Sequence, residues 1–223
     1  MGCNSAHYTE LMHDKLSKLP VQGDEGLHKD SDIPHDHLPD KPLREAAVLM
    51  PLVWHDAAWQ LLFIRRASND KDRHSGQVAF PGGRKDPTDA SAEETALREA
   101  HEEIGVHPSK VSLLGRLYDY TTISYYKVTP VVGTVEWPQA LTLQQSEVSR
   151  AFTIPLQWLA QRDNFTLRGR DELDPDTARR HPIIVYEPYD GEVLWGASAR
   201  MTMNLIKTID EGKMILPARK NKS

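Results

Sequence analysis

The sequence predicts an α/β sandwich, because strand-like apolar runs are mixed with two or three helical segments along most of its 223 residues. Apolar residues make up 39% and charged residues 26%, which is usual for a globular protein that buries a sizeable core. The expected strands cover residues 46–50, 59–64, 77–80, 111–120, 127–135 and 182–186, and the expected helices cover 91–105, 156–160 and 197–209.

Each element has a local sequence signal. Apolar runs mark the strands, and Pro81 followed by two glycines stops the one over 77–80. Ser91 is a good N-cap with Glu94 three residues later, which is the capping-box pattern, and Gly105 stands where a C-cap glycine ends a helix. The last helix repeats apolar residues at every fourth position from Met201, so one of its faces is expected in the core.

The first 42 residues differ in composition from the rest. Residues 21–40 hold six acids and one lysine, and five of the ten histidines lie in residues 1–42. Few apolar residues are available to order this segment, so we predict a poorly ordered extension over 1–42, with a short helix over 7–19 and a histidine metal site as the weaker alternative. A folded domain is expected over 43–212 and a short basic tail over 213–223.

Charge and cysteine content exclude several classes of protein. The net charge of −5 and a pI near 6.1 disfavour a nucleic-acid binder. The single cysteine, Cys3, allows neither an intrachain disulfide nor a Cys-based zinc site, and it favours a reducing, cytoplasmic compartment. No apolar run approaches the roughly 18 residues of a membrane helix. We expect a small-molecule substrate and no nucleic-acid or membrane partner; the oligomeric state is open, with a homodimer as one alternative.

The helix over 91–105 carries a cluster of acids near its C-terminal end. Glu99, Glu102 and Glu103 lie where the helix dipole disfavours negative charge. Arg98 is spaced to pair with Glu94 and Glu102, but no helix residue is spaced to relieve the repulsion between Glu99 and Glu103. A divalent cation would reverse that repulsion, and oxygen ligands at this spacing suit Mg²⁺ or Mn²⁺. A solvated acidic face is the alternative.

The residues around these acids resemble the Nudix box. The segment REAHEEIGV over 98–106 is similar to the core of that motif, R-E-U-x-E-E-x-G-U, in which U is a bulky apolar residue. Gly83 precedes Arg98 by fifteen positions where the box has fourteen. Ala90 stands where the box has Glu, flanked by Asp89 and Ser91.

A longer stretch resembles the coenzyme A pyrophosphatase branch of the Nudix hydrolases. The matching runs are LFIRRA over 62–67, GQVAFPGG over 76–83 and ALREA over 96–100, joined by Arg73, Asp86, Asp89 and Ser91. The resemblance implies an α/β/α sandwich with a mixed sheet between helices. It also implies metal-dependent hydrolysis of coenzyme A into 3′,5′-ADP and 4′-phosphopantetheine. The alternatives are another diphosphate substrate (ADP-ribose, a dinucleotide or a nucleoside triphosphate) and a non-catalytic nucleotide-binding module.

The resemblance further implies roles for single residues. Glu99 and Glu103 are expected to hold the cation, with Glu102 contributing directly or through water and a backbone carbonyl near Gly82 as a further ligand. Glu102 and Glu147 are the catalytic candidates; Glu147 is either a loop carboxylate that orients water or the cation, or a first-turn helix residue.

Substrate binding is expected from a local group of basic and polar residues. Arg65, Arg66, Arg73 and Gln77 form this group, and guanidinium groups bind phosphates bidentately. Arg65 and Arg66 are neighbours on a strand and therefore point to opposite faces, so at most one of them is expected to contact the ligand.

Overall fold

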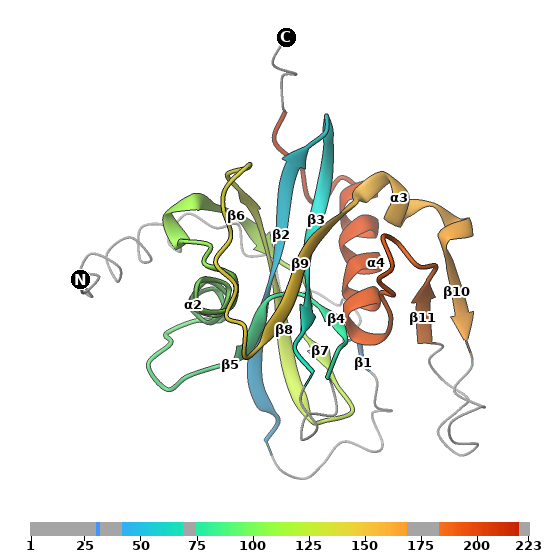
Figure 1. Ribbon diagram of the computed structural model, residues 1–223. Helices are drawn as coiled ribbons and strands as arrows, with labels where there is room; N and C mark the ends of the chain where they lie inside the picture. The colour runs from blue at the N-terminus through green and yellow to red at the C-terminus, as the bar shows by residue number, and fades with distance from the viewer. Residues whose placement is uncertain (1–29, 32–41, 69–74, 169–182, 219–223) are drawn as a thin grey trace.

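The computed structural model describes residues 30–31, 42–68, 75–168 and 183–218 (Figure 1). Its strands are β1 (Asp30–Ser31), β2 (Arg44–His55), β3 (Ala58–Arg66), β4 (Val78–Ala79), β5 (Gly82–Arg84), β6 (Val111–Arg116), β7 (Tyr120–Thr121), β8 (Tyr126–Val135), β9 (Val148–Pro155), β10 (Phe165–Arg168) and β11 (Ile183–Tyr186). Its α-helices are α2 (Ala92–Ile104), α3 (Leu156–Ala160) and α4 (Gly196–Asp210), with short 3-10 turns at Pro108–Lys110 and Arg162–Asn164. The helix expected over 7–19 lies outside the described residues.

A mixed sheet forms the middle of the molecule. Strand β2 runs parallel to β8 along one edge and antiparallel to β5 and then β3 along the other. Strands β6 and β7 pair with β8, β4 and β9 pair with β3, and β1 adds a parallel strand to β7. A separate antiparallel pair, β10 and β11, lies beside α4 (Figure 1).

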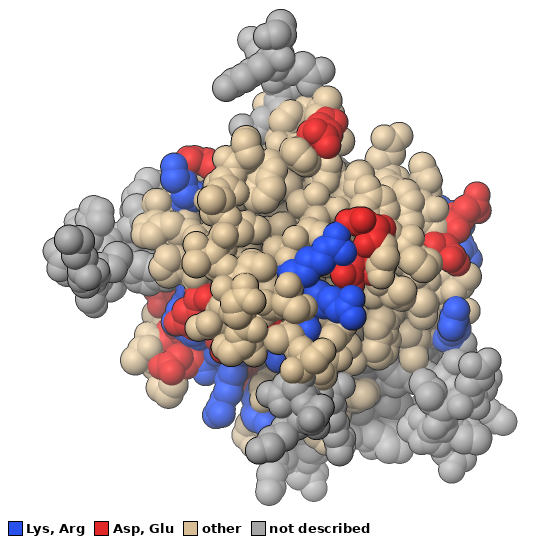
Figure 2. Space-filling model, viewed as in Figure 1, with Lys and Arg blue, Asp and Glu red and all other residues tan. Residues whose placement is uncertain are grey.

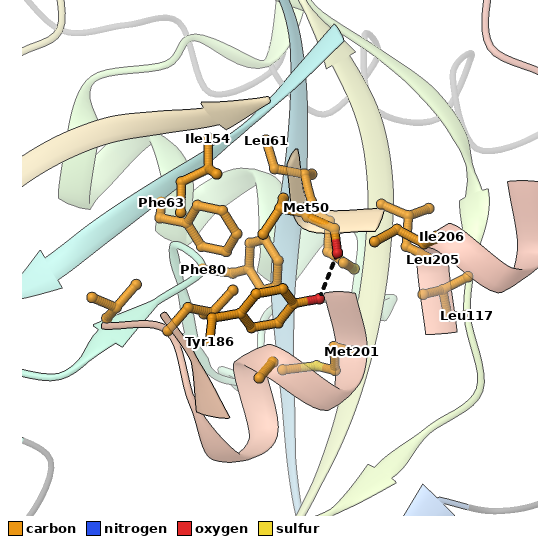
Figure 3. Packing of buried hydrophobic residues seen from close by; sticks show 14 of the residues in the cluster. Met50, Leu61, Phe63, Phe80, Leu117, Ile154, Tyr186, Met201, Leu205 and Ile206 are labelled. Carbon is orange, nitrogen blue, oxygen red and sulfur yellow. Dashed lines mark hydrogen bonds between the residues drawn. The ribbon is translucent and has the colours of Figure 1, made fainter. Parts of the chain in front are cut away.

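Helices cover both faces of this sheet, which confirms the α/β/α sandwich. On one face, Ala96, Leu97 and Ala100 of α2 pack among buried residues of β2 and β3. On the other face, Met201 and Leu205 of α4 belong to a second cluster with Tyr186 and the opposite side of the same strands (Figure 3). Because both faces are covered, β2 is buried continuously from Leu49 to Val53, as expected for a central strand.

Strand β2 continues through Pro51 and ends at His55, five residues beyond the expected end at Met50. A proline lacks the N–H that a ladder needs. Along this edge of β2, pairing with β5 ends at Val48 and pairing with β3 begins at Leu52. Pro51 therefore falls where this edge of β2 changes partner, while on the other edge it lies in register with Gly133 of β8.

Three other expectations need correction. The strand expected over 111–120 is two strands, β6 and β7. The expected elements include none of the strands β1, β5, β9 and β10, although Phe152 and Ile154 of β9 are buried with the alternation of a strand. Because β9 begins at Val148, Glu147 precedes a strand, and the alternative of a first-turn helix residue is wrong.

We expect Tyr186→Phe to lower the free energy of unfolding by about 1–2 kcal/mol, because it leaves a buried carbonyl without its donor. The buried Tyr186 hydroxyl donates to the Leu159 carbonyl oxygen at 3.1 Å (Figure 3). Urea unfolding measures the change. Tyr125→Phe is the matched control, because 46% of Tyr125 is exposed. Equal stability of both variants would contradict a structural role for this bond.

Candidate active site

Helix α2 is fixed at both ends. The Ser91 side chain accepts the Glu94 N–H, and the Glu94 carboxylate accepts the Ala90 N–H at 2.7 Å, so the expected capping signal forms. Gly105 adopts the left-handed conformation at φ 73° and closes the helix as expected. These two caps set which side chains of the last turns meet the neighbouring strand.

Arg98 holds the acids of α2 together: the expected pair with Glu102 forms, and Asp89 and Glu99 are partners that were not expected. Its guanidinium donates to Asp89 at 2.9 Å, to Glu99 at 2.8 Å and to Glu102 at 3.0 Å. The expected pair with Glu94 is wrong, because the Glu94 carboxylate turns back to the helix start. The nearly buried Asp89 thus supplies a carboxylate partner for Arg98, although Ala90 occupies the Glu position of the motif.

A pair of glycines brings β5 into contact with the carboxylates of α2. The Gly82 N–H donates to the Glu103 carboxylate at 2.8 Å. A Cβ atom on Gly83 would stand only 2.6 Å from the nearer carboxylate oxygen of Glu99, and one on Gly82 would clash with the Ala47 carbonyl. A side chain at Gly82 is therefore excluded by backbone, and one at Gly83 would displace the Glu99 carboxylate, so the glycine pair lets the acids reach the strand backbone.

Glu147 joins this group through the loop before β9. The N–H groups of Thr142 and Gln144 donate to the carbonyls of Ile104 and Glu103 at the end of α2. The Glu147 carbonyl then accepts the N–H of Ala67 at 2.8 Å, just after β3. The loop therefore places Glu147 between the ends of α2 and β3, next to Glu99 and Glu103.

The buried acids carry shifted pKa values. Burial raises the pKa of Glu103 to about 8, with repulsion from Glu99 and Glu147 in the same direction and the Gly82 N–H and Arg66 charge opposing it. Burial also raises the pKa of Glu99, against the hydrogen bond from Arg98. Glu102, by contrast, has a side chain that is 57% exposed. Two of the four acids thus share a site that disfavours their charged forms unless a cation is present.

The two neighbouring arginines lie on opposite faces, as expected. The Arg65 guanidinium pairs with the buried Glu192 at 3.3 Å, on the α4 side of the sheet. The Arg66 charge acts on Glu103, and its backbone N–H donates to the Gln77 carbonyl at 3.0 Å. Arg66 and Gln77 therefore border the carboxylate site, whereas Arg65 is held away from it; Arg73 lies outside the described residues.

A divalent cation fits this donor set. Within the described ranges, no three His, Cys, Asp or Glu side chains are close enough together to hold a metal ion on their own. Mg²⁺ is usually bound by one or two carboxylates, with water and substrate phosphates completing its shell. Glu99 and Glu103 would supply those carboxylates beside the glycine backbone.

This fold and site define a class of proteins: α/β/α sandwiches in which carboxylates of a helix meet a glycine pair of the sheet, with an arginine charge beside them. A NUDIX domain model matches residues 43–177, and the chain belongs to the Nudix family. It is therefore an enzyme of the Nudix hydrolases, whose general reaction is hydrolysis of a pyrophosphate bond and which generally use divalent metal ions.

Curated relatives bear the same family name. The chain is 36% identical over 168 residues to a protein of Pectobacterium atrosepticum named uncharacterized Nudix hydrolase NudL, covering 75% of this chain and 84% of that protein. It is 34% identical over 180 residues to a protein of Yersinia pestis with the same name, covering 81% and 87%.

Solved structures of Nudix proteins also match. A MutT/nudix family protein from Enterococcus faecalis gives a TM-score of 0.46 at 14% identity, over 95% of this chain and 74% of that one. The NUDIX domain of Shewanella oneidensis NrtR, solved with ADP-ribose, gives a TM-score of 0.42 at 24% identity, over 52% and 75%.

The helices in the described part of the chain do not combine the length and the apolar character of a membrane-spanning helix. None of its helices is both long and apolar enough to span a bilayer.

We expect Asp89→Asn to lower the free energy of unfolding by about 1–3 kcal/mol at pH 7, because it weakens a charged hydrogen bond to Arg98. Burial raises the pKa of Asp89, but its bonds from Arg98, Asp86 and Thr95 outweigh burial, and the net pKa lies below 3.8. The stabilisation is thus present above the unfolded pKa and lost as pH falls through the folded pKa. Urea unfolding should show a constant gap between wild type and variant from pH 7 to 5 and a narrowing gap below about pH 4. A gap that does not depend on pH would contradict this assignment.

Proposed function

We propose that this chain hydrolyses the diphosphate linkage of coenzyme A or its derivatives, with Mg²⁺ or Mn²⁺ as its cofactor. Water adds across the P–O–P bridge, one P–O bond breaks, and the products are 3′,5′-ADP and 4′-phosphopantetheine. The single cysteine supports a cytoplasmic location for this reaction.

The observation that carries the proposal is the position of the 76–83 run, GQVAFPGG. This run resembles the coenzyme A branch, and it forms one wall of the carboxylate site. Its first part bonds to β3 through the Gln77 carbonyl, and its last part brings Gly82 and Gly83 against Glu103 and Glu99. The run that resembles the coenzyme A branch therefore lies beside the carboxylates that suit a divalent cation.

The side chains around this wall have separable tasks. Glu99 and Glu103 hold the cation, and Arg66 binds a phosphate of the diphosphate. Glu147, exposed at the end of its loop, accepts a proton from the attacking water or orients that water. Arg98 keeps Glu99 and Glu102 in place through its bond to Asp89. The bound cation supplies charge stabilisation for the phosphoryl group in the transition state.

The direct test incubates the full chain with coenzyme A and either Mg²⁺ or Mn²⁺ and separates the products by chromatography. We expect equal amounts of 3′,5′-ADP and 4′-phosphopantetheine, and none after chelation. A panel of ADP-ribose, a dinucleotide and a nucleoside triphosphate tests the other substrates. Faster turnover of one of these, or binding without turnover of any, would reject the coenzyme A assignment.

We expect Glu103→Gln to reduce turnover at least about a hundredfold, because a metal-binding carboxylate is lost at a site of developing charge. Without metal, the variant should be as stable as the wild type or slightly more stable, because a neutral amide replaces an acid whose charged form burial disfavours. Mg²⁺ should raise the melting temperature of the wild type more than that of the variant. Glu136→Gln is the control, with a side chain that is 66% exposed. Full activity of Glu103→Gln would refute the metal role.

Arg65 and Arg66 form a matched pair for substrate binding. We expect Arg66→Gln to raise KM for the substrate more than it lowers kcat, because its charge faces the carboxylate site. Arg65→Gln should leave KM near the wild-type value and lower stability instead, because Glu192 is nearly buried and loses a partner. Steady-state kinetics and thermal unfolding of both variants measure these effects. A larger KM change in Arg65→Gln would reverse the assignment of the two faces.

A further inference from the structure

A polar cavity of about 470 Å³ lies between the first turn of α2 and strand β8. We call it the α2–β8 cavity. Its lining shares no residue with the carboxylate site, and it contains the cationic side chains of Lys85, Arg116 and Lys127 and the acidic side chains of Glu45 and Asp119. A volume of this size suits a small ligand, and a lining this polar suits a charged one.

The two acids of the cavity already have partners. Glu45 pairs with Lys85 at 3.3 Å and with Lys127 at 3.1 Å, and both contacts lower the pKa of Glu45, so its charge is retained. Asp119 accepts the Thr129 hydroxyl at 2.6 Å and lies 3.9 Å from Lys127. The acids thus offset two of the three cations.

Arg116 is the remaining cation. Its side chain is exposed, and no side chain among the described residues forms a hydrogen bond or ion pair with it. An ammonium group carries three donors, so Lys85 and Lys127 keep free donors while they contact Glu45. The cavity therefore has a surplus of positive charge and N–H donors, with a guanidinium that is available for a bidentate contact.

We propose that the α2–β8 cavity binds a phosphate monoester, with Arg116 as its main contact and Lys85 and Lys127 as supporting contacts. The cavity lies close to the carboxylate site along two elements. Thr95 lines the cavity and Glu99 follows it by one turn, about 6 Å along the α2 axis, while Lys85 follows Gly83 by two residues. The phosphate belongs either to the far end of the substrate or to a separate ligand. The first of these two sources rests on the proposed function.

The binding arm of the test needs no turnover. In the presence of a chelator, inorganic phosphate and adenosine 3′-monophosphate are titrated into the full chain by calorimetry. We expect binding to the wild type, at least tenfold weaker binding to Arg116→Gln, and partial recovery in Arg116→Lys. Lys207→Gln removes the same charge from an α4 side chain that is 74% exposed, and it should bind like the wild type.

The kinetic arm identifies the source of the phosphate. If it belongs to the substrate, Arg116→Gln should lower kcat/KM for coenzyme A about tenfold and leave that for dephospho-coenzyme A unchanged. If it belongs to a separate ligand, Arg116→Gln still weakens phosphate binding, but the ratio of kcat/KM for coenzyme A to kcat/KM for dephospho-coenzyme A does not change. The proposal would be overturned by an unchanged ratio of the two kcat/KM values combined with either of two binding results. These are no phosphate binding to the wild type, or equal binding to the wild type and Arg116→Gln. If the wild type does not cleave coenzyme A, the proposed function fails and the binding arm alone decides.

Discussion

The close approach of α2 to β5 is the constraint on which the rest of this structure depends. Two carboxylates of one helix contact the backbone of a glycine pair, and any side chain on Gly83 would occupy the space of Glu99. The approach requires that α2 begin and end at fixed residues, which Ser91 and Gly105 ensure. It also requires a flat apolar surface beneath the helix, which the continuous buried run of β2 provides. On the face of the molecule in Figure 2, basic and acidic side chains lie interspersed.

Local patterns predicted most of the fold correctly. The caps of α2, the central strands and the terminal helix each have a signal within a few residues, and all of them form. The missed strand β9 has such a signal too, in the alternation of Phe152 and Ile154, but its start follows a polar loop that also suits a helix. The length of β2 could not be predicted from nearby residues. A proline at position 51 fits the strand because pairing with β5 ends before it and pairing with β3 begins after it.

The candidate site shows the same division between local and long-range information. The repulsion between Glu99 and Glu103 is visible from their spacing, and the opposed faces of Arg65 and Arg66 follow from strand geometry. Which arginine faces the acids depends on Glu192, more than a hundred residues away in sequence. The same holds for Asp89, since only the conformation of the loop before α2 brings its carboxylate to Arg98. Spacing identified the acids, and tertiary structure selected their partners.

The acids of α2 also show how a stable fold carries an unfavourable site. One N–H from Gly82 does not offset the burial of Glu103, and Arg98 does not offset the burial of Glu99, because both pKa values stay raised. The helix tolerates this because its caps are satisfied and its apolar side, from Ala96 to Ile104, is fully buried against the sheet. The apolar side of α2 supplies packing against the sheet, and the carboxylates proposed to hold a cation lie on its other side. Unfavourably placed carboxylates therefore occur in α2 where a bound cation is proposed to offset their charge. Such a local conflict is typical of a functional site.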